Sequence, residues 1–174
     1  SMQRMLPQVR YRLRTVGAAK APVRTLGGLT LLPDCATAEL DAQEIATLIL
    51  PGADTWQEPE QQAILSLAVR LLEQGVPVAA ICGATLGLAD RGILHGRRHT
   101  SNSLEFLTAL SANYTGEGYD AAALAVADGP LITAGSAGGL LWAKYILERL
   151  QVYTPAVIAA WYRYFLRGHA DDYA

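Results

Sequence analysis

The chain has 174 residues, within the ~100–200 residues of one typical domain, and we expect a single domain over residues 1–174. Hydrophobic residues make up 51% of it and charged residues 17%, a composition that supports a buried core and excludes intrinsic disorder. A net charge of −2 predicts no nucleic-acid partner. The apolar runs are shorter than the ~20 residues of a membrane span, which predicts no membrane partner.

Cysteine usage and the N-terminus indicate where the protein works. Cys35 and Cys82 are the two cysteines, too few for a disulfide framework. The opening residues do not show the basic-then-apolar pattern of a signal peptide, so we expect none. We therefore expect a cytoplasmic protein.

The first half of the chain alternates predicted strands with one helix. Residues 9–16 alternate apolar residues with arginines, which is typical of a strand with one solvent-facing side. Residues 29–34 give a second short strand. Residues 47–50 (TLIL) form an apolar run that ends at Pro51-Gly52 and predict a strand buried on both faces. The apolar stripe within residues 58–74 predicts an amphipathic helix.

The second half continues the alternation. Residues 76–81 (VPVAAI) predict a second buried strand, followed by a short helix over 85–90 and a further helix over 102–112. Residues 121–133 predict two short strands joined at Asp128-Gly129, and two helices follow over 137–150 and 155–166. This order predicts an α/β fold in three layers, with a mainly parallel sheet and helices on both of its faces.

Ligands of open α/β sheets bind beyond the carboxyl ends of the strands. Three segments are expected to reach that edge: LILPGADTW, VAAICGAT and LITAGSAGG. In the second segment, Cys82 lies between a strand and a helix. A thiol at the positive end of a helix has a lowered pKa and a larger thiolate fraction.

Backbone groups beside Cys82 complete a candidate nucleophile site. The N–H of Gly83 could hold an oxyanion, and the peptide of Gly52-Ala53, at the neighbouring strand end, could supply a second donor. The alternative is that Cys82 is merely a small buried residue, as free cysteines usually are.

A thiol nucleophile also needs a proton acceptor. His99 lies 17 residues after Cys82, past one short helix and a turn, so it could return to the same edge. His95 falls in a Gly-Arg-rich turn and His169 in the polar tail. The alternative for His99 is an ordinary structural hydrogen bond.

Other chemistries find less support. Two cysteines and three histidines show no paired ligand spacing, so we expect no metal. The glycines of TAGSAGG match neither the dinucleotide fingerprint nor the phosphate loop, so we expect no cofactor.

With Cys82 and His99 identified, the sequence resembles the DJ-1/PfpI family of the class I glutamine amidotransferase-like superfamily, and its bacterial PfpI-type members in particular. The segments that carry the resemblance are LILPGADTW, VPVAAICGATLGLADRGILHGRRHTSN and LITAGSAGGLLWAKYILERL. The resemblance implies a flavodoxin-like sheet and a homodimer. It also implies Cys82 as the elbow nucleophile, His99 as its partner, and an oxyanion site at Gly83 with Gly52 or Ala53.

The N-terminus departs from this family. Members open with a hydrophobic strand and then a loop whose acidic residue hydrogen-bonds the elbow cysteine, and neither has a counterpart here. That strand lies inside the sheet, so its loss would leave unpaired backbone groups at ~1–3 kcal/mol for each one buried. The sequence could be truncated, another chain could donate the strand, or residues 1–8 could fill the gap.

Two main functions follow. The first is an enzyme in which Cys82 attacks a carbonyl or amide carbon of a small-molecule or peptide substrate, as a hydrolase or a glyoxalase- or deglycase-like enzyme. The second is a non-enzymatic stress-response protein with a redox-sensing Cys82. A catalytically inactive regulatory subunit is a third possibility.

Overall fold

The computed structural model describes residues 11–169 and 171. Its main sheet has four strands in the order β5-β6-β8-β7. Strands β5 (Leu48–Leu50), β6 (Val78–Ile81) and β8 (Leu131–Ala134) run parallel, and β7 (Ala125–Asp128) is antiparallel to β8. The β7–β8 turn contains Gly129, whose φ of 56° favours glycine. The predicted mainly parallel sheet is confirmed.

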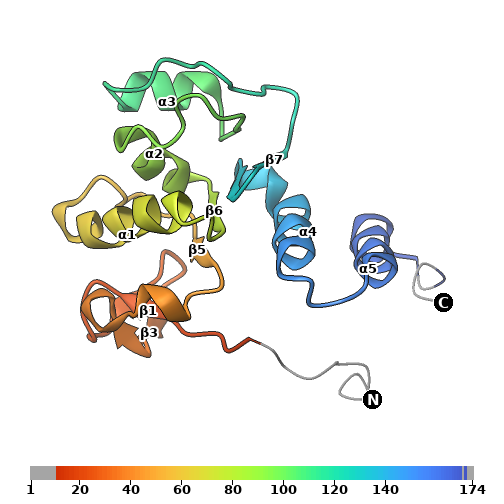
Figure 1. Cartoon of the computed structure of the whole chain (residues 1–174), viewed down its shortest axis with the longest axis horizontal. Helices are drawn as coiled ribbons and strands as arrows, with labels where there is room; N and C mark the ends of the chain where they lie inside the picture. The colour runs from red at the N-terminus through yellow and green to blue at the C-terminus, as the bar shows by residue number, and fades with distance from the viewer. Residues whose placement is uncertain (1–10, 170, 172–174) are drawn as a thin grey trace.

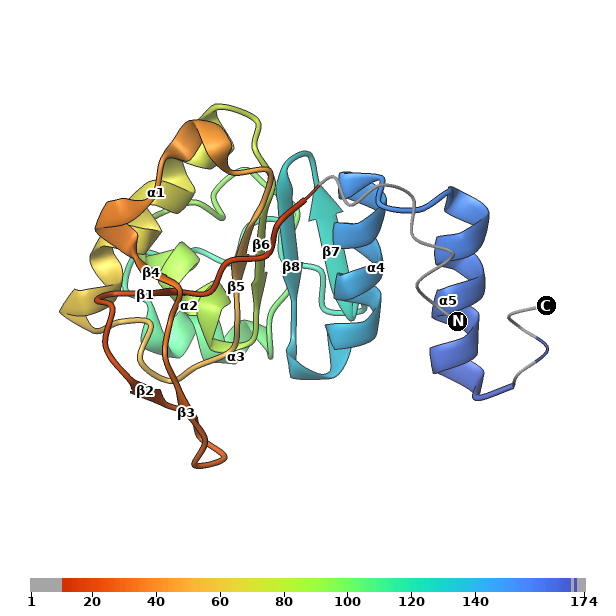
Figure 2. The same ribbon diagram turned by 90° about the horizontal axis from the view of Figure 1, so that it is seen from below.

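Helices cover both faces of this sheet (Figures 1 and 2). Helices α1 (Gln62–Glu73), α2 (Gly83–Asp90) and α3 (Leu104–Leu110) lie on one side. Helix α4 (Gly139–Leu150) packs on the other side, and α5 (Pro155–Arg167) packs on α4 as an outer element. The predicted three-layer arrangement is therefore confirmed, with one additional helix outside it.

The larger core lies between the sheet and the first group of helices. Its most deeply buried side chains come from the apolar stripe of α1, from α2 and from the strands: Leu65, Leu71, Leu88, Val78 and Leu131. A smaller cluster of Ala79, Ile132 and Ile146 joins the sheet to α4. Among the described residues, no helix is both long and apolar enough to span a bilayer.

The N-terminal part forms two small strand pairs. β1 (Val16–Gly17) pairs in parallel with β4 (Cys35–Ala36), and β2 (Val23–Arg24) pairs antiparallel with β3 (Thr30–Leu31). The strand predicted over residues 9–16 is wrong for most of its length: residues 11–15 are irregular and exposed, and residues 9–10 lie outside the described residues.

The strand predicted to be buried on both faces is also corrected. Within the described residues, β5 hydrogen-bonds to β6 alone, and Ile49 in its middle is 40% exposed. Leu48 and Leu50 face the core, so one face of β5 is covered and the other is open to solvent. Residues 1–8 are one candidate to take the place of the family's missing first strand, and they lie outside the described part of the chain.

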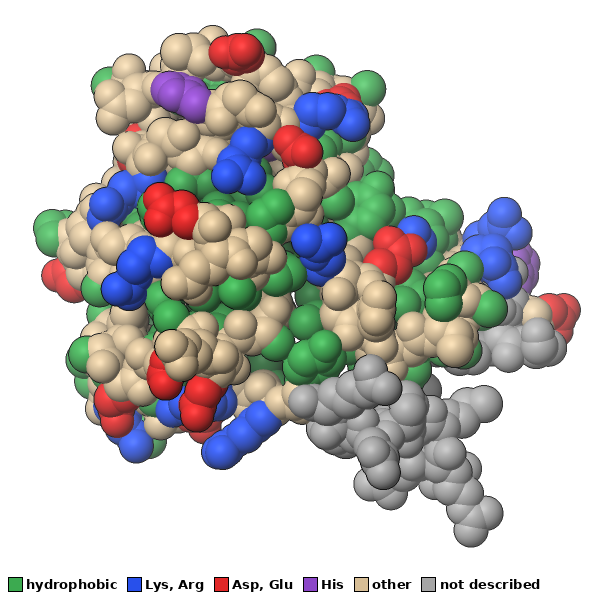
Figure 3. Space-filling model, in the orientation of Figure 1, with side chains coloured by type: hydrophobic (Ala, Val, Ile, Leu, Met, Phe, Trp, Pro, Cys, Tyr) green, Lys and Arg blue, Asp and Glu red, His purple; other side chains and the backbone are tan. Residues whose placement is uncertain are grey.

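Charged side chains are spread over the surface. On the face drawn in Figure 3, basic and acidic side chains are interspersed and do not gather by sign.

Candidate active site

Cys82 occupies a strained turn between β6 and α2. Its φ and ψ are 56° and −127°, and it is one of two described non-glycine residues with positive φ. Such a conformation costs about 1–3 kcal/mol and persists only where the surroundings impose it. The predicted strand–cysteine–helix turn is present, and α2 begins at Gly83, two residues earlier than expected.

Hydrogen bonds on both sides of Cys82 hold the turn. Its N–H donates to the carbonyl of Ala134 at 2.9 Å, and its carbonyl accepts from the Thr85 N–H at 3.1 Å and from the Thr85 hydroxyl at 2.6 Å. The Thr85 oxygen also lies 2.6 Å from Ser101 Oγ. Because the Thr85 proton is used on the carbonyl, Ser101 is the donor in this second bond. The elbow is thus tied to the segment that carries Asn102.

Glycines permit the close packing around the thiol. A Cβ on Gly83 would lie 1.9 Å from the Ala53 carbonyl oxygen, and a Cβ on Gly52 would lie 3.0 Å from Cys82 Cβ and 3.5 Å from Sγ. The structure therefore brings Gly52, Ala53 and Gly83 together beside the sulfur. Their action as an oxyanion site stays a prediction.

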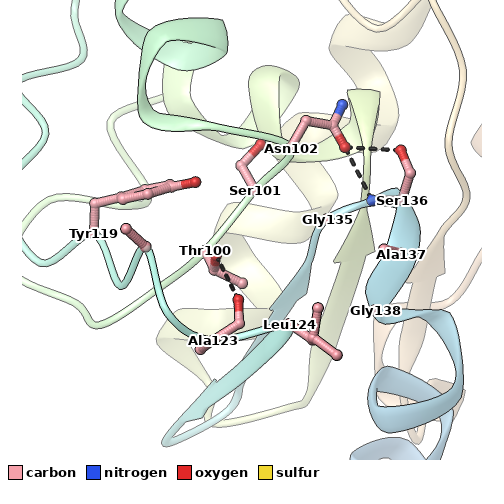
Figure 4. Close-up of a pocket in the computed structure, with 11 residues that line it drawn as sticks. Thr100, Ser101, Asn102, Tyr119, Ala123, Leu124, Gly135, Ser136, Ala137 and Gly138 are labelled. Carbon is pink, nitrogen blue, oxygen red and sulfur yellow. Dashed lines mark hydrogen bonds between the residues drawn. The ribbon is translucent and has the colours of Figure 1, made fainter.

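Two polar side chains contact the sulfur. The Asn102 amide nitrogen lies 3.4 Å from Sγ and the Ser136 hydroxyl lies 3.1 Å from it. Asn102 Oδ1 accepts from the Ser136 N–H at 3.0 Å and from its hydroxyl at 2.8 Å (Figure 4). Since a backbone N–H can only donate, this bond fixes the amide with its NH₂ group toward the sulfur.

The Ser136 hydroxyl has one proton and two possible acceptors. When Cys82 is a thiol, its S–H can donate to Ser136 Oγ while the Ser136 proton goes to Asn102 Oδ1. When Cys82 is a thiolate, the Ser136 proton can turn to Sγ, and Asn102 still donates from its amide. The same side chains thus satisfy both protonation states.

These contacts decide the acidity of the thiol. Burial by itself raises the pKa of Cys82, but hydrogen bonds from Ser136, Asn102 and the Gly83 N–H lower that pKa to below the ordinary cysteine value. The charge of Asp54 acts weakly in the opposite direction. Among the described residues, no carboxylate hydrogen-bonds Sγ, and the side chains that donate to it are an amide and a hydroxyl.

His99 is bound elsewhere. Its side chain is fully buried, with Nδ1 2.8 Å from the Arg97 carbonyl oxygen and Nε2 2.6 Å from the Tyr114 hydroxyl. A carbonyl only accepts, so Nδ1 carries the proton and Nε2 accepts from Tyr114. Both ring nitrogens are engaged, and the described hydrogen bonds do not pair His99 with Cys82.

Burial favours the neutral forms of both rings. It lowers the pKa of His99, partly opposed by the bond to the Arg97 carbonyl, and it raises the pKa of Tyr114 to about 12. His99 thus makes structural hydrogen bonds, which is the alternative stated above. A catalytic role for His99 stays a prediction.

A pocket adjoins the Asn102–Ser136 pair. Its volume is about 340 Å³, and it is formed by three segments, residues 100–102, 119–124 and 135–138 (Figure 4). Gly135 and Gly138 allow these segments to approach closely, since a Cβ on Gly138 would lie 2.0 Å from the Leu124 carbonyl oxygen. Within the described residues, no cluster of three or more His, Cys, Asp or Glu side chains could hold a metal ion.

Neither Ser136 nor Asn102 is predicted from the sequence to act at the thiol, although LITAGSAGG, which carries Ser136, is expected at the same sheet edge as Cys82. The available signal was their position, since both follow segments that end at the same edge as Cys82. Residue type directs attention to histidine instead, because histidine is the more familiar partner of a catalytic thiol.

Comparison with known proteins places these features in a family. The model of the DJ-1/PfpI family matches residues 2–149. The chain is 41% identical over 149 residues to a protein of Bacillus subtilis (strain 168) named uncharacterized protease YoaZ, covering 86% of this chain and 71% of that protein. It is also 35% identical over 78 residues to a deglycase of Pyrococcus abyssi, covering 42% of this chain and 45% of that protein.

Solved structures agree in fold. The thiJ/pfpI family protein of Bacillus anthracis superposes with a TM-score of 0.85 and 38% identity, covering 91% of this chain and 74% of that one. The DJ-1 superfamily protein of Agrobacterium tumefaciens gives 0.82 and 29%, covering 93% and 86%.

Proposed function

The chain belongs to the DJ-1/PfpI family, and from this premise we propose that it is a cysteine-dependent enzyme that attacks carbonyl or amide carbons of small-molecule or peptide substrates. The observation that carries the proposal is the contact of Cys82 Sγ with Ser136 and Asn102, which lowers the pKa of the thiol at a strained, solvent-accessible turn. The thiolate, and not the thiol, is the form that attacks, and a lowered pKa increases the thiolate fraction.

The proposed reaction uses this geometry in two steps. The thiolate forms an S–C bond to the substrate carbon as the carbonyl electron pair moves to oxygen, and the N–H groups of Gly83 and of Gly52 or Ala53 stabilise that oxyanion. With an amide substrate, collapse of the oxyanion breaks the C–N bond, and the amine leaves with a proton taken from water. In a hydrolase, a water molecule next breaks the thioester and restores Cys82.

The relatives narrow the candidate reactions. One relative is named an uncharacterized protease and another a deglycase. We propose a hydrolase- or deglycase-like activity, working in the cytoplasm and as a homodimer.

A second candidate function rests on a specific gap in the site. The described residues place no imidazole or carboxylate against Sγ as proton acceptor, so the thiolate could serve as a redox sensor in a stress response. Low-pKa, accessible thiolates are the ones that peroxide oxidises.

Turnover assays with Cys82→Ala as control test the proposal. The substrates are a fluorogenic peptide amide and methylglyoxal-modified N-acetylarginine, assayed by fluorescence and chromatography. We expect turnover of at least one, falling by at least about 100-fold in Cys82→Ala. Equal turnover by the variant would overturn the nucleophile role. No turnover together with selective sulfinic acid formation at Cys82 under mild peroxide would favour the sensor.

A further inference from the structure

The pocket beside the thiol has uncharged walls. Asn102 and Ser136 belong both to this pocket and to the hydrogen bonds on Cys82 Sγ. None of its eleven lining residues carries a charged side chain: Thr100, Ser101, Asn102, Tyr119, Ala121, Ala123, Leu124, Gly135, Ser136, Ala137 and Gly138. A charged group bound there would find no counter-charge to offset the loss of its hydration.

The nearest acid along the chain is already satisfied. Asp120 follows Tyr119, and one of its carboxylate oxygens accepts from the Arg98 guanidinium at 3.0 Å. The other accepts from the backbone N–H groups of Ala122 and Ala123, each at 3.1 Å. The carboxylate therefore shapes the loop that forms one wall of the pocket.

Most polar side chains of the pocket are also engaged. The Thr100 hydroxyl donates to the Ala123 carbonyl at 3.1 Å, and Ser101 donates to Thr85. Ser136 and Asn102 bond each other and the sulfur. Of the side-chain hydroxyls that line this pocket, that of Tyr119 has no hydrogen-bond partner within the described residues.

The Tyr119 ring is held in a fixed position, so its hydroxyl is available to a bound molecule. Its plane meets the buried His99 ring edge-on, with centroids 5.8 Å apart. The backbone on either side is pinned, because the His99 N–H donates to the Gly118 carbonyl at 3.1 Å and the Asp120 N–H donates to the His99 carbonyl at 2.8 Å. Figure 4 shows the phenol oxygen directed across the pocket toward residues 100–102.

We infer that this pocket binds an uncharged, hydrogen-bonding part of the substrate, an amide or a hydroxyl-bearing arm, and that Tyr119 is the positioning residue that bonds it. The inference rests on the proposed function, because the bound arm presents the adjoining carbon to Cys82. It also gives His99 a task that needs no contact with the thiol, namely to fix the Tyr119 ring.

Two matched alkylating probes test this inference on the intact protein. Chloroacetyl-glycinamide and chloroacetyl-glycine differ only in an amide against a carboxylate. In both, Sγ forms a bond to the CH₂ carbon as chloride leaves. Labelling of the Cys82 peptide is followed by mass spectrometry at a series of probe concentrations, which separates the half-saturating concentration from the limiting rate. Iodoacetamide, which is too small to extend into the pocket, reports the reactivity of the thiol itself.

We expect saturable labelling by the glycinamide probe and at least about tenfold less efficient labelling by the carboxylate probe. Tyr119→Phe should raise the half-saturating concentration of the glycinamide probe about three- to tenfold and leave the limiting rate and the iodoacetamide rate unchanged. Tyr153→Phe makes the same chemical change outside the pocket and should alter none of these values.

Three results would contradict the inference or what it rests on. If Tyr119→Phe labels like the wild type, Tyr119 does not bind the arm. The charge of Asp54 acts on the thiol and would by itself repel the carboxylate probe, so the comparison is repeated in Asp54→Asn. If the carboxylate probe labels as efficiently as the glycinamide in the wild type or in Asp54→Asn, the pocket does not select an uncharged group. In either case normal iodoacetamide reactivity leaves the proposed function standing, whereas an inert Cys82 toward all three reagents overturns the proposed function itself.

Discussion

At the scale of single residues, the site depends on how one proton is shared. Ser136 can donate to Asn102 or to Cys82 Sγ, and the Asn102 amide is oriented by the Ser136 backbone N–H. The pKa of the thiol is thus set by neutral donors, without an ion pair. Neutral donors lower a thiol pKa less than a cation would, but they add no charge for a substrate to balance.

Asn102→Asp should raise the pKa of the Cys82 thiol. An ionised carboxylate cannot donate to Sγ and adds a like charge beside the thiolate, so the pKa of Cys82 should rise. Each unit of that rise lowers the thiolate fraction at pH 7 by up to about tenfold. We expect the iodoacetamide rate of the Cys82 peptide at pH 7 to fall accordingly.

Asn113→Asp is the matched control, because it makes the same charge change at an exposed site whose amide contacts the Asp90 carbonyl and not the thiol. A similar loss of rate in both variants would show that net charge, and not the Asn102 contact, sets the reactivity.

At the scale of elements, the elbow depends on the approach of β5's loop to α2. Gly83 lies against the Ala53 carbonyl where a Cβ would meet the oxygen at 1.9 Å. The contact involves backbone on the other side, so no side chain can turn away to relieve it.

Gly83→Ala should therefore destabilise the protein by about 1–3 kcal/mol, the usual range for forced overpacking. Urea unfolding monitored by circular dichroism measures it. The control is Gly27→Ala, where nothing lies within 4 Å of the added Cβ and the free energy of unfolding should change by less than about 1 kcal/mol. Equal stability of the two variants would mean that the loop after β5 does not sit against α2 as described.

The sequence predicts the elements near the site better than those near the N-terminus. The buried strand β6, the amphipathic α1 and the Asp128-Gly129 turn each have a local signal, a continuous apolar run, a period of 3.6 or a turn pair, and all three are present. Residues 9–16 also alternate in the manner of a strand, yet strand formation needs a neighbour to accept the hydrogen bonds, and this is not visible in local sequence. The exposure of Ile49 was not predicted for the same reason: which neighbours cover a strand cannot be read from its local sequence.

The thiol's contacts were beyond local reasoning for a related reason. Cys82 was identified from the strand that precedes it and the glycine that follows it. Its partners lie 20 and 54 residues away, and which of Asn102, His99 and Ser136 reaches the sulfur depends on how the loops pack in three dimensions. Spacing along the chain cannot resolve that.

At the scale of the whole molecule, the buried His99 links stability to pH. Burial lowers its pKa in the folded protein, whereas in the unfolded chain it takes up a proton below pH ~6.5. The unfolded state then binds more protons than the folded one, so this group's contribution is unaffected above that pH and the free energy of unfolding falls as the pH decreases below it.

Urea unfolding between pH 5 and 8 should show this loss, with a slope for this group of up to about 1.4 kcal/mol per pH unit below pH ~6.5. His99→Gln should reduce the slope. Tyr114→Phe removes the hydroxyl that bonds Nε2 but keeps the buried imidazole, so it should lower stability and retain the slope. An unchanged slope in His99→Gln would show that His99 is not the group responsible.

The pH dependence of Cys82 alkylation tests most directly whether Ser136 and Asn102 lower the pKa of the thiol. The iodoacetamide rate of the Cys82 peptide is measured from pH 5 to 10 in the wild type and in Ser136→Ala. We predict a wild-type midpoint below the ~8.5 of an unperturbed cysteine and a midpoint displaced to higher pH in Ser136→Ala. A wild-type midpoint at or above that value, or the same midpoint in both proteins, would contradict the account.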